Sequence, residues 1–436
     1  MVRVKTIEIR WHAGDEKTNQ PILSCDFNPR TGILATAGAD REIKLWSVDA
    51  DADREISVTH SETLTGHARA VNCARWNTRG DMLASAGDGG EVLVWRRTEE
   101  ASTSTNAHGD AVTWKPARTL RGHLDDALDV SWGPNETLAS ASVDNTTILW
   151  NVESGSGLVK LQEHSHYVQG VAFDPRGEYV VSQSPDRTAR VYTLGERITS
   201  KSVKHAKMIK TLEDPSGCAS MRDDSMTSFF RRPAWSLDGS FFVLPAGMFK
   251  RSSAERSLNT SLVFARHDFN VPAMHLPGGE TPSVCVRFNP VLFVKRERQC
   301  EHVPTDLAYR IVFAICSQDS VTVYDTSESE PIVHVSGIHC TSITDASWHP
   351  DGHTLVVTST DGFASVVAFR KGELGAVMLE ADVPEDVRSL LPSVRARQKP
   401  PSSEIQCAPL VPRAETVKTK AVPVRVAPVR IAPIPM

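Results

Sequence analysis

Apolar and polar residues alternate along most of this chain, in short runs that turn residues separate. Residues 121–150 show the pattern most clearly. Alternation from Ala127 to Trp132 is followed by a turn at 133–135, small residues at 138–142, a second turn at 144–145 and a last run that ends in Trp150. Period-two alternation between turns predicts short antiparallel strands rather than helices.

The same unit recurs along the chain, opening with glycine and histidine where it is most complete and closing with an aromatic residue. Such a repeat predicts one blade of a β-propeller, because a four-stranded blade buries both of its faces only when other blades pack against it. We expect an all-β fold, a seven-bladed WD-repeat β-propeller, with blades at about residues 21–46, 66–95, 122–150, 163–192, 234–265, 284–324 and 344–369.

The two ends of the predicted ring and its fifth blade are the least regular parts of the pattern. Segment 2–11 alternates like a strand, and we expect it to complete the last blade, which would close the ring and cover an edge. After residue 195 the repeat weakens. We expect a basic connection at 196–210 and a loop at 247–259 inside the fifth blade.

Polar residues at fixed places in the repeat predict a hydrogen-bonded chain inside each blade. An unpaired buried polar group costs roughly 1–3 kcal/mol. A histidine, a serine, an aspartate and a tryptophan that hydrogen-bond to one another avoid this cost and can therefore be buried together. We interpret two sets of residues as structural blade networks: His67, Asp88 and Trp95 in the second blade, and His123, Asp144 and Trp150 in the third. His123 is then a structural residue and neither a metal ligand nor a catalytic base.

Composition changes near residue 372, after which proline becomes frequent and aromatic residues are absent. We therefore predict a propeller at 1–371 and a disordered, basic, proline-rich tail at 372–436. Residues 387–436 hold nine basic and two acidic residues, so the rest of the chain is more acidic than the net charge of -5. An acidic disc suits a platform for basic proteins and disfavours direct DNA binding, although acidity can also serve solubility alone.

Known catalytic and cofactor patterns do not occur in the sequence. There is no phosphate-binding loop, dinucleotide fingerprint, zinc-protease motif or nucleophile elbow, so we predict a non-enzymatic protein without cofactor or metal. The 8 cysteines are scattered without a C-x-x-C pair, as is typical of reduced intracellular thiols. No secretory signal and no apolar run of about 18 residues occurs, which predicts no membrane contact.

Seven short stretches carry a resemblance to the WD-repeat middle subunit of chromatin assembly factor one, across roughly residues 6–375. The run at 228–232 distinguishes this family from other WD-repeat proteins, and the related HIR-type subunit shares parts of it. The matching stretches are Trp11-His12, residues 119–124, 141–145, 167–171, 223–232 without Thr227, 244–247 and 319–321.

The resemblance implies a nuclear role in a three-part complex. The family complex deposits histones three and four onto newly replicated or repaired DNA, and its partners are the large and small subunits and the histones, with DNA contacted only through the complex. The family tail binds the anti-silencing-factor histone chaperone by strand addition. That role maps onto two copies of an Arg-[Ile/Val]-x-Pro motif, with Arg425, Val426 and Pro428 in one and Arg430, Ile431 and Pro433 in the other.

The tail pattern has a physical basis of its own. Proline every five residues blocks helix formation, while β-branched residues favour an extended chain that can join the edge of a partner's sheet. A plain proline-rich tail is the alternative. The family motif has two adjacent arginines, whereas valine precedes both Arg425 and Arg430 here.

Residues 229–232 have two interpretations. The phenylalanines are expected to pack the fifth blade. Arg231 and Arg232 either pair with Asp223 and Asp224 or contact the large subunit or histones, and they are the candidate partner contact on the propeller. For the whole chain, the alternative is a substrate-receptor propeller of a ubiquitin ligase; a propeller enzyme would need a polar cluster in the central channel.

Overall fold

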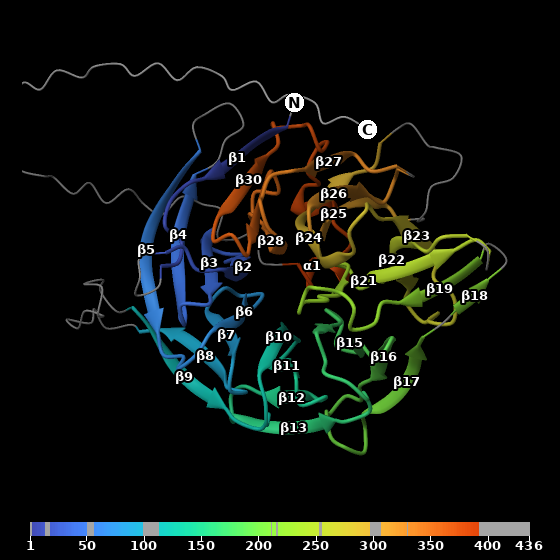
Figure 1. Cartoon of the computed structure of the whole chain (residues 1–436), viewed down its shortest axis with the longest axis horizontal. Coiled ribbons are helices and arrows are strands. Elements are labelled where there is room, and N and C mark those ends of the chain that lie inside the picture. Colours follow the sequence, from blue (N-terminus) through green and yellow to red (C-terminus); the bar gives the residue numbers. More distant parts are fainter. Residues whose placement is uncertain are drawn as a thin grey trace, which may run out of the picture. The chain divides into compact units, whose positions relative to one another are not determined.

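The computed structural model describes residues 2–13, 18–49, 56–98, 113–210, 212–214, 217–252, 255–296, 307–328 and 330–391. Seven antiparallel sheets form a ring of blades, with one strand of each near the central axis (Figure 1). The seven-bladed propeller predicted from the repeat is therefore confirmed. The compact unit that contains the ring spans Met1–Arg397, and the unit Gln398–Met436 lies outside the described residues.

Each blade runs from an innermost strand to an outermost strand. The first three blades are β2 (Ile22–Phe27), β3 (Ile33–Gly38), β4 (Glu42–Asp49) and β5 (Ser57–Thr65); β6 (Val71–Trp76), β7 (Met82–Gly87), β8 (Val92–Arg97) and β9 (Trp114–Leu120); and β10 (Ala127–Trp132), β11 (Thr137–Ser142), β12 (Thr147–Asn151) and β13 (Ser156–Leu161).

The remaining blades follow the same order, with additions in the fifth. They are β14 (Gly170–Phe173), β15 (Tyr179–Ser184), β16 (Thr188–Thr193) and β17 (Lys204–Ile209); β20 (Ala234–Trp235), β21 (Phe241–Lys250), β22 (Leu258–Ala265) and β23 (Met274–Pro277), with β18 (Leu212–Asp214) and β19 (Gly217–Met221) added; β24 (Ser283–Val294), β25 (Tyr309–Ser317), β26 (Ser320–Asp325) and β27 (Val333–Ser336); and β28 (Ile343–Trp348), β29 (Thr354–Ser359), β30 (Ala364–Ala368) and β1 (Arg3–Ile7).

The outermost strand of the seventh blade comes from the start of the chain. β1 pairs antiparallel with β30, from Arg3 opposite Ala368 to Ile7 opposite Ala364, and Figure 1 shows the two strands side by side. The Thr6 and Ser365 hydroxyl groups lie 2.8 Å apart across this pair. The first and last segments of the ring thus share one sheet, as the alternation at 2–11 led us to expect.

Two expectations for the irregular middle of the chain are wrong. The connection at 196–210 contains β17, which is the outermost strand of the fourth blade. The loop expected at 247–259 is largely the far half of a long hairpin, because β21 and β22 continue past a change of register between Leu244 and Gly247. Ala246 takes a φ of 57° at this bulge, and β19 adds to the extended half of β21.

The hydrophobic core is divided among the seven interfaces between neighbouring blades. In one of seven clusters Leu45 and Leu64 of the first blade pack with Leu83 and Trp95 of the second, and the other clusters likewise join consecutive blades. Each blade therefore depends on both neighbours for its buried apolar surface, which is the physical reason that the ring must close.

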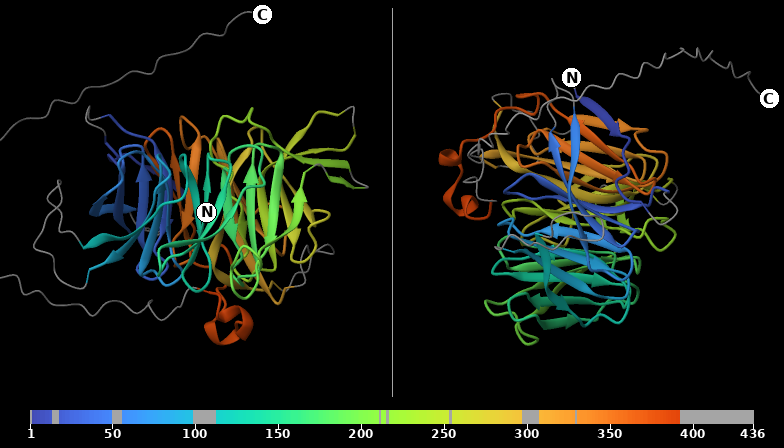
Figure 2. Two further views of the ribbon diagram at one scale, coloured as in Figure 1. Left: turned by 90° about the horizontal axis from the view of Figure 1, so that it is seen from below. Right: turned by 90° about the vertical axis from the view of Figure 1, so that its left-hand side faces the viewer.

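The boundary between propeller and tail lies later than predicted. Residues 372–391, which the sequence analysis placed in a disordered tail, include η1 (Glu380–Asp382) and α1 (Glu385–Arg388) and pack on the propeller (Figure 2). The amide of Met378 donates to the carbonyl of Leu292, and Val383 and Val387 are buried against the interface of blades five and six. The assignment of 372–391 to the tail is wrong because a few aliphatic residues suffice to dock a segment on an existing core.

The rest of the predicted tail, residues 392–436, lies outside the described residues. Within the part of the chain that the structure describes, neither helical segment has the length and apolar composition that crossing a bilayer requires.

Candidate functional site

The third blade contains the complete hydrogen-bonded chain expected from its sequence. The indole nitrogen Nε1 of Trp150 donates to Oγ of Ser140 at 2.8 Å, and that hydroxyl lies 2.7 Å from Nε2 of His123. Nδ1 of the same ring lies 3.2 Å from the Asp144 carboxylate, which can only accept, so Nδ1 carries the proton. His123, Ser140 and Trp150 are buried, and the network is structural.

The glycine that opens the repeat makes room for the tryptophan that closes it. A Cβ atom on Gly122 would lie 2.8 Å from a ring carbon of Trp150, and a Cβ atom on Gly66 would lie equally close to Trp95. Any side chain at these positions would therefore push the indole ring out of its place.

In the second blade the structure corrects one member of the network. Nε2 of His67 lies 2.7 Å from Oγ of Ser85, to which Trp95 also donates, but Nδ1 of His67 meets Glu91 at 3.1 Å. Asp88 instead accepts a hydrogen bond from the Asn72 side chain at 2.8 Å. The assignment of Asp88 was wrong because the same turn also contains Glu91 and two glycines. Spacing in the sequence could not decide which of the two carboxylates reaches His67.

Two further blades contain the same arrangement, which the sequence analysis did not assign. His12 bridges Asp40 and Thr36 in the first blade. His164 bridges Asp186 and Ser182 in the fourth. His12 precedes the first blade in the sequence, and no glycine stands directly before it as in the second and third blades. The sequence pattern therefore did not predict its place in the network.

Asp88 of the second blade and Asp144 of the third should differ in how mutation and pH at each of them change the stability of the fold. Burial alone would raise the pKa of Asp144, but hydrogen bonds from His123, Thr146 and the Leu124 amide outweigh it and hold the pKa below the ordinary value. Its ionised form therefore stabilises the fold above the unfolded pKa of about 3.9, and this stabilisation is lost as the pH falls through the folded pKa. Burial raises the pKa of Asp88, so the fold does not favour its charge.

We expect Asp144→Asn to lower the free energy of unfolding at pH 7 and to reduce the loss of stability in acid. Asp88→Asn is the matched control and should leave the free energy of unfolding at pH 7 unchanged or slightly higher. Urea denaturation of both variants at pH 7 and pH 3 measures the difference. Equal destabilisation by the two changes at pH 7 would contradict the network described for the third blade.

Arg232 lies at the central axis and is fully buried, which excludes the predicted partner contact. Its guanidinium donates to the carbonyls of Leu23 at 3.1 Å, Thr344 at 3.0 Å and Asn72 at 2.7 Å, in blades one, seven and two. It also lies 3.4 Å from Asp129 of blade three. The Arg232 amide donates to the Val284 carbonyl of blade six at 2.9 Å, so one residue before blade five joins five other blades.

Arg231 is equally inaccessible, and its predicted partners also need correction. Its guanidinium donates to the backbone carbonyls of Arg222 and Asp223 rather than to the carboxylates of Asp223 and Asp224. Burial lowers the pKa of Arg231 to about 10. The Asp223 carboxylate instead accepts from Ser225 and from Arg187, which together lower its pKa to about 2. Both arginines therefore hold the loop at 222–233 in place.

Arg232 belongs to a buried ion cluster that the sequence pattern does not predict. Asp345 is fully buried and lies 2.7 Å from Arg75 Nη2, 2.6 Å from Arg287 Nη2 and 3.2 Å from Arg232 Nη1. Burial would raise the pKa of Asp345, but the three arginines outweigh it and hold the carboxyl ionised. A sequence signal existed, since Arg75 and Arg287 each precede the aromatic residue that ends the alternation of an innermost strand.

The ring has two distinct faces. We call the face at which the innermost strands begin the front face, formed by loops 66–70, 121–126, 162–169 and 222–233; the rear face, where these strands end, includes turns 28–32, 77–81, 133–136 and 174–178. On the front face Phe229 is 66% exposed, whereas Phe230 is buried and stacks on Arg232 at 4.0 Å. The expected packing therefore holds for Phe230 and is wrong for Phe229.

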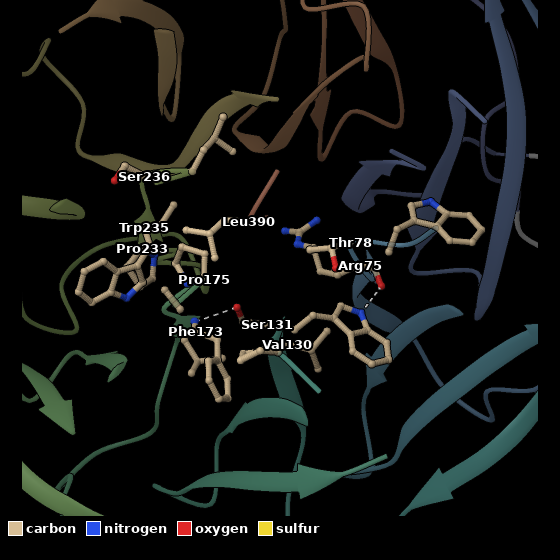
Figure 3. Close-up of a pocket in the computed structure, with 18 of the residues that line it drawn as sticks. Arg75, Thr78, Val130, Ser131, Phe173, Pro175, Pro233, Trp235, Ser236 and Leu390 are labelled. Carbon is tan, nitrogen blue, oxygen red and sulfur yellow. Dashed lines mark hydrogen bonds between the residues drawn. The ribbon is translucent and has the colours of Figure 1, made fainter. Parts of the chain in front are cut away.

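A pocket of about 400 Å³ opens where the innermost strands of blades two to five end (Figure 3). Its walls are largely apolar and include Trp132, Phe173 and Pro175, while Arg75, Asp129 and Arg287 supply charged groups. Leu390, which follows α1, also lines this pocket, so the segment that crosses the rear face reaches its rim. Among the described residues, no three His, Cys, Asp or Glu side chains lie together in a way that could hold a metal ion.

The six predicted docking residues of the tail, Arg425, Val426, Pro428, Arg430, Ile431 and Pro433, lie outside the described residues. The described surface therefore offers an exposed phenylalanine on the front face and an apolar pocket on the rear face.

Comparison with known proteins places this arrangement in context. The family model described as the CAF1B/HIR1 beta-propeller domain matches residues 2–374. The chain is 39% identical over 390 residues to the chromatin assembly factor 1 subunit FAS2 homolog of Oryza sativa subsp. japonica, across 86% of this chain and 74% of that protein. It is 36% identical over 405 residues to a chromatin assembly factor 1 subunit of Mus musculus, across 88% and 69%. For the corresponding chromatin assembly factor 1 protein of Saccharomyces cerevisiae the identity is 33% over 408 residues, across 83% and 85%.

Proposed function

Because this chain belongs to the CAF1B/HIR1 beta-propeller family, we propose that it is the non-catalytic middle subunit of a chromatin assembly factor 1 complex that deposits histones three and four on newly replicated or repaired DNA. The observation that carries the proposal is similarity to proteins named as chromatin assembly factor 1 subunits over the whole ring. The family model spans residues 2–374, a range that contains the loop at 222–233.

The geometry supports a scaffold rather than an enzyme. In the described part of the chain, Asp345 near the central axis pairs with Arg75, Arg232 and Arg287, and the histidine of the third blade is bound within its blade network. The proposed partners are the large and small subunits of the complex and histones three and four, and the proposed location is the nucleus. DNA is contacted through the assembled complex. The relatives at 33–39% identity bear chromatin assembly names, which favours this role over that of a ubiquitin-ligase receptor.

The tail is proposed to dock the anti-silencing-factor histone chaperone by adding a strand to its sheet. Arg425, Val426 and Pro428, followed by Arg430, Ile431 and Pro433, supply apolar side chains at alternate positions with an arginine that can pair with an acidic group. Proline at the end of each copy limits pairing to one edge.

Truncation after Ala421 tests the tail and the complex separately. We expect the truncated chain to assemble with the large and small subunits and to deposit histones on plasmid DNA as the full chain does. Its affinity for the purified chaperone, measured by calorimetry, should fall below detection. The control Lys420→Ala removes a basic residue outside both motifs and should bind the chaperone normally.

Two outcomes separate the claims. Unchanged chaperone affinity after truncation would remove the tail proposal and leave the complex in place. Failure of the full-length chain to assemble with the large and small subunits would remove the proposed function itself.

A further inference from the structure

The outer edge of the fourth blade is basic, although the propeller as a whole is acidic. Between residues 197 and 212 the sequence has five lysine and arginine residues and no aspartate or glutamate. We call these five residues the basic edge: Arg197, Lys201, Lys204, Lys207 and Lys210. Lys204 and Lys207 belong to β17, the outermost strand of the blade, which lies at the margin of the ring in Figure 1.

The basic edge is accessible and extends along the side of the ring. Four of its side chains are exposed, and the half-buried Lys207 donates to the side-chain oxygen of Asn270 at 2.8 Å. β17 pairs antiparallel with β16 and runs from the rear face toward the front face. Its 6 residues span about 20 Å at 3.3 Å per residue. The cations are therefore distributed along one side of the ring.

The charges of the basic edge are not compensated within the molecule. In the part of the chain that the structure describes, none of its five side chains forms an ion pair. By contrast, the nearby Arg187, Arg190 and Arg266 each pair with a carboxylate. The cations of the basic edge are therefore available to an anion from outside.

Two other uses of exposed lysines fit the basic edge less well. Lysine can protect the open edge of a sheet from pairing with another chain. However, β5, β23 and β27 are also outermost strands and contain neither lysine nor arginine. A protein interface usually has an apolar centre, but none of the exposed large hydrophobic residues of the described chain lies at 197–210. Contact with a nucleic-acid backbone needs cations alone.

We propose that the basic edge of the fourth blade contacts the phosphate backbone of duplex DNA without reading its sequence. The inference goes beyond the proposed function, in which DNA is contacted through the assembled complex, because it assigns one of those contacts to the propeller. Four of the five cations are lysines, which are point charges on flexible stems and bind phosphates without a fixed geometry.

The dimensions and the charge of the propeller are compatible with this contact. Phosphates of one DNA strand are 3.4 Å apart along the helix axis, so about 20 Å of protein strand can follow about six of them. The acidic remainder of the propeller does not cancel the attraction, because charges more than about 8 Å away are largely screened at physiological salt.

The affinity of the full-length chain for DNA at several salt concentrations tests this contact. The triple change Lys201→Glu, Lys204→Glu and Lys210→Glu should weaken binding of a fluorescein-labelled duplex by about tenfold or more in fluorescence anisotropy. The plot of log K against log salt concentration should become shallower by roughly 3, because each phosphate contact contributes about 0.9 to its slope. Arginine at the same three positions should preserve both quantities. All three side chains are exposed, so the melting temperature should not change.

A second triple variant separates the basic edge from the net charge of the chain. Lys115, Arg121 and Lys371 are exposed elsewhere on the ring, and changing each to glutamate alters the net charge by the same amount. This control should keep the wild-type salt dependence. Both triple variants retain the basic residues after 391, so any contribution of those residues to DNA binding is the same in both.

Three results would overturn the inference. The first is wild-type affinity and salt dependence in the glutamate variant of the basic edge. The second is an equal loss in the two triple variants, which would show an effect of net charge alone. The third is tighter binding of a polyglutamate peptide than of the duplex, lost in the same variant, which would assign the edge to an acidic protein.

Assembly of the complex tests the proposed function separately. If the complex assembles and deposits histones while the glutamate variant of the basic edge binds DNA as the wild type does, the inference is wrong and the function stands. If the wild-type chain does not assemble with the large and small subunits, the proposed function fails, whatever the affinity of the chain for DNA.

Discussion

Replacing Arg232 with alanine is expected to lower the free energy of unfolding of the propeller by about 3–5 kcal/mol, because it removes one partner of a buried ionic cluster and leaves a buried carboxylate without its arginine. Asp345 would keep two arginines, but Asp129 would lose the only arginine that the structure places within 4 Å of it among the described residues. The carbonyls of Leu23, Asn72 and Thr344 would lose their guanidinium donor as well.

Denaturant unfolding of the full chain measures this effect. Arg232→Lys should recover part of the loss, since an ammonium group keeps the charge but cannot reproduce the planar set of donors that reaches three carbonyls. Arg121→Ala, at an exposed arginine of the front face, is the control and should change the free energy of unfolding by no more than about 0.5 kcal/mol. A small effect at Arg232 would mean that the axis is held by packing alone.

The role of Arg232 shows what sequence could and could not provide. Period-two alternation and the spacing from His123 to Trp150 were sufficient for the fold and for one complete blade network, because both depend on local order. Arg232 contacts residues up to 209 positions away in the chain, and no local pattern encodes such a contact. The sequence marked the loop as distinctive, but burial decided that its arginines are structural and that Phe229 is the exposed residue.

The other errors have the same origin. Asp88 was chosen over Glu91 because it had the expected spacing, whereas the backbone of a turn with two glycines brings Glu91 to His67. The segment at 372–391 lacks aromatic residues, but Val383 and Val387 pack against the hydrophobic cluster at the interface of blades five and six. Composition predicts whether a segment can build its own core, and it does not predict docking on a core that other residues have built.

Trp150→Ala is expected to cost about 3–5 kcal/mol of the free energy of unfolding, the range for loss of a large buried aromatic side chain. Trp150 is 2% exposed and packs at the interface of blades two and three, so its removal opens a cavity between blades as well as within one. The same change also deprives the Ser140 hydroxyl of its indole donor. Thermal unfolding with the wild type as reference measures the loss.

Trp150→Phe separates the two contributions. The phenyl ring keeps much of the buried apolar surface but has no N–H group, so the loss should be smaller, about 1–3 kcal/mol for the unmet hydrogen bond together with the reduced volume. A Trp150→Ala protein with an unchanged melting temperature would contradict the blade assignment. Equal losses in the two variants would show that the bond to Ser140, rather than packing, makes the closing residue of the repeat a tryptophan.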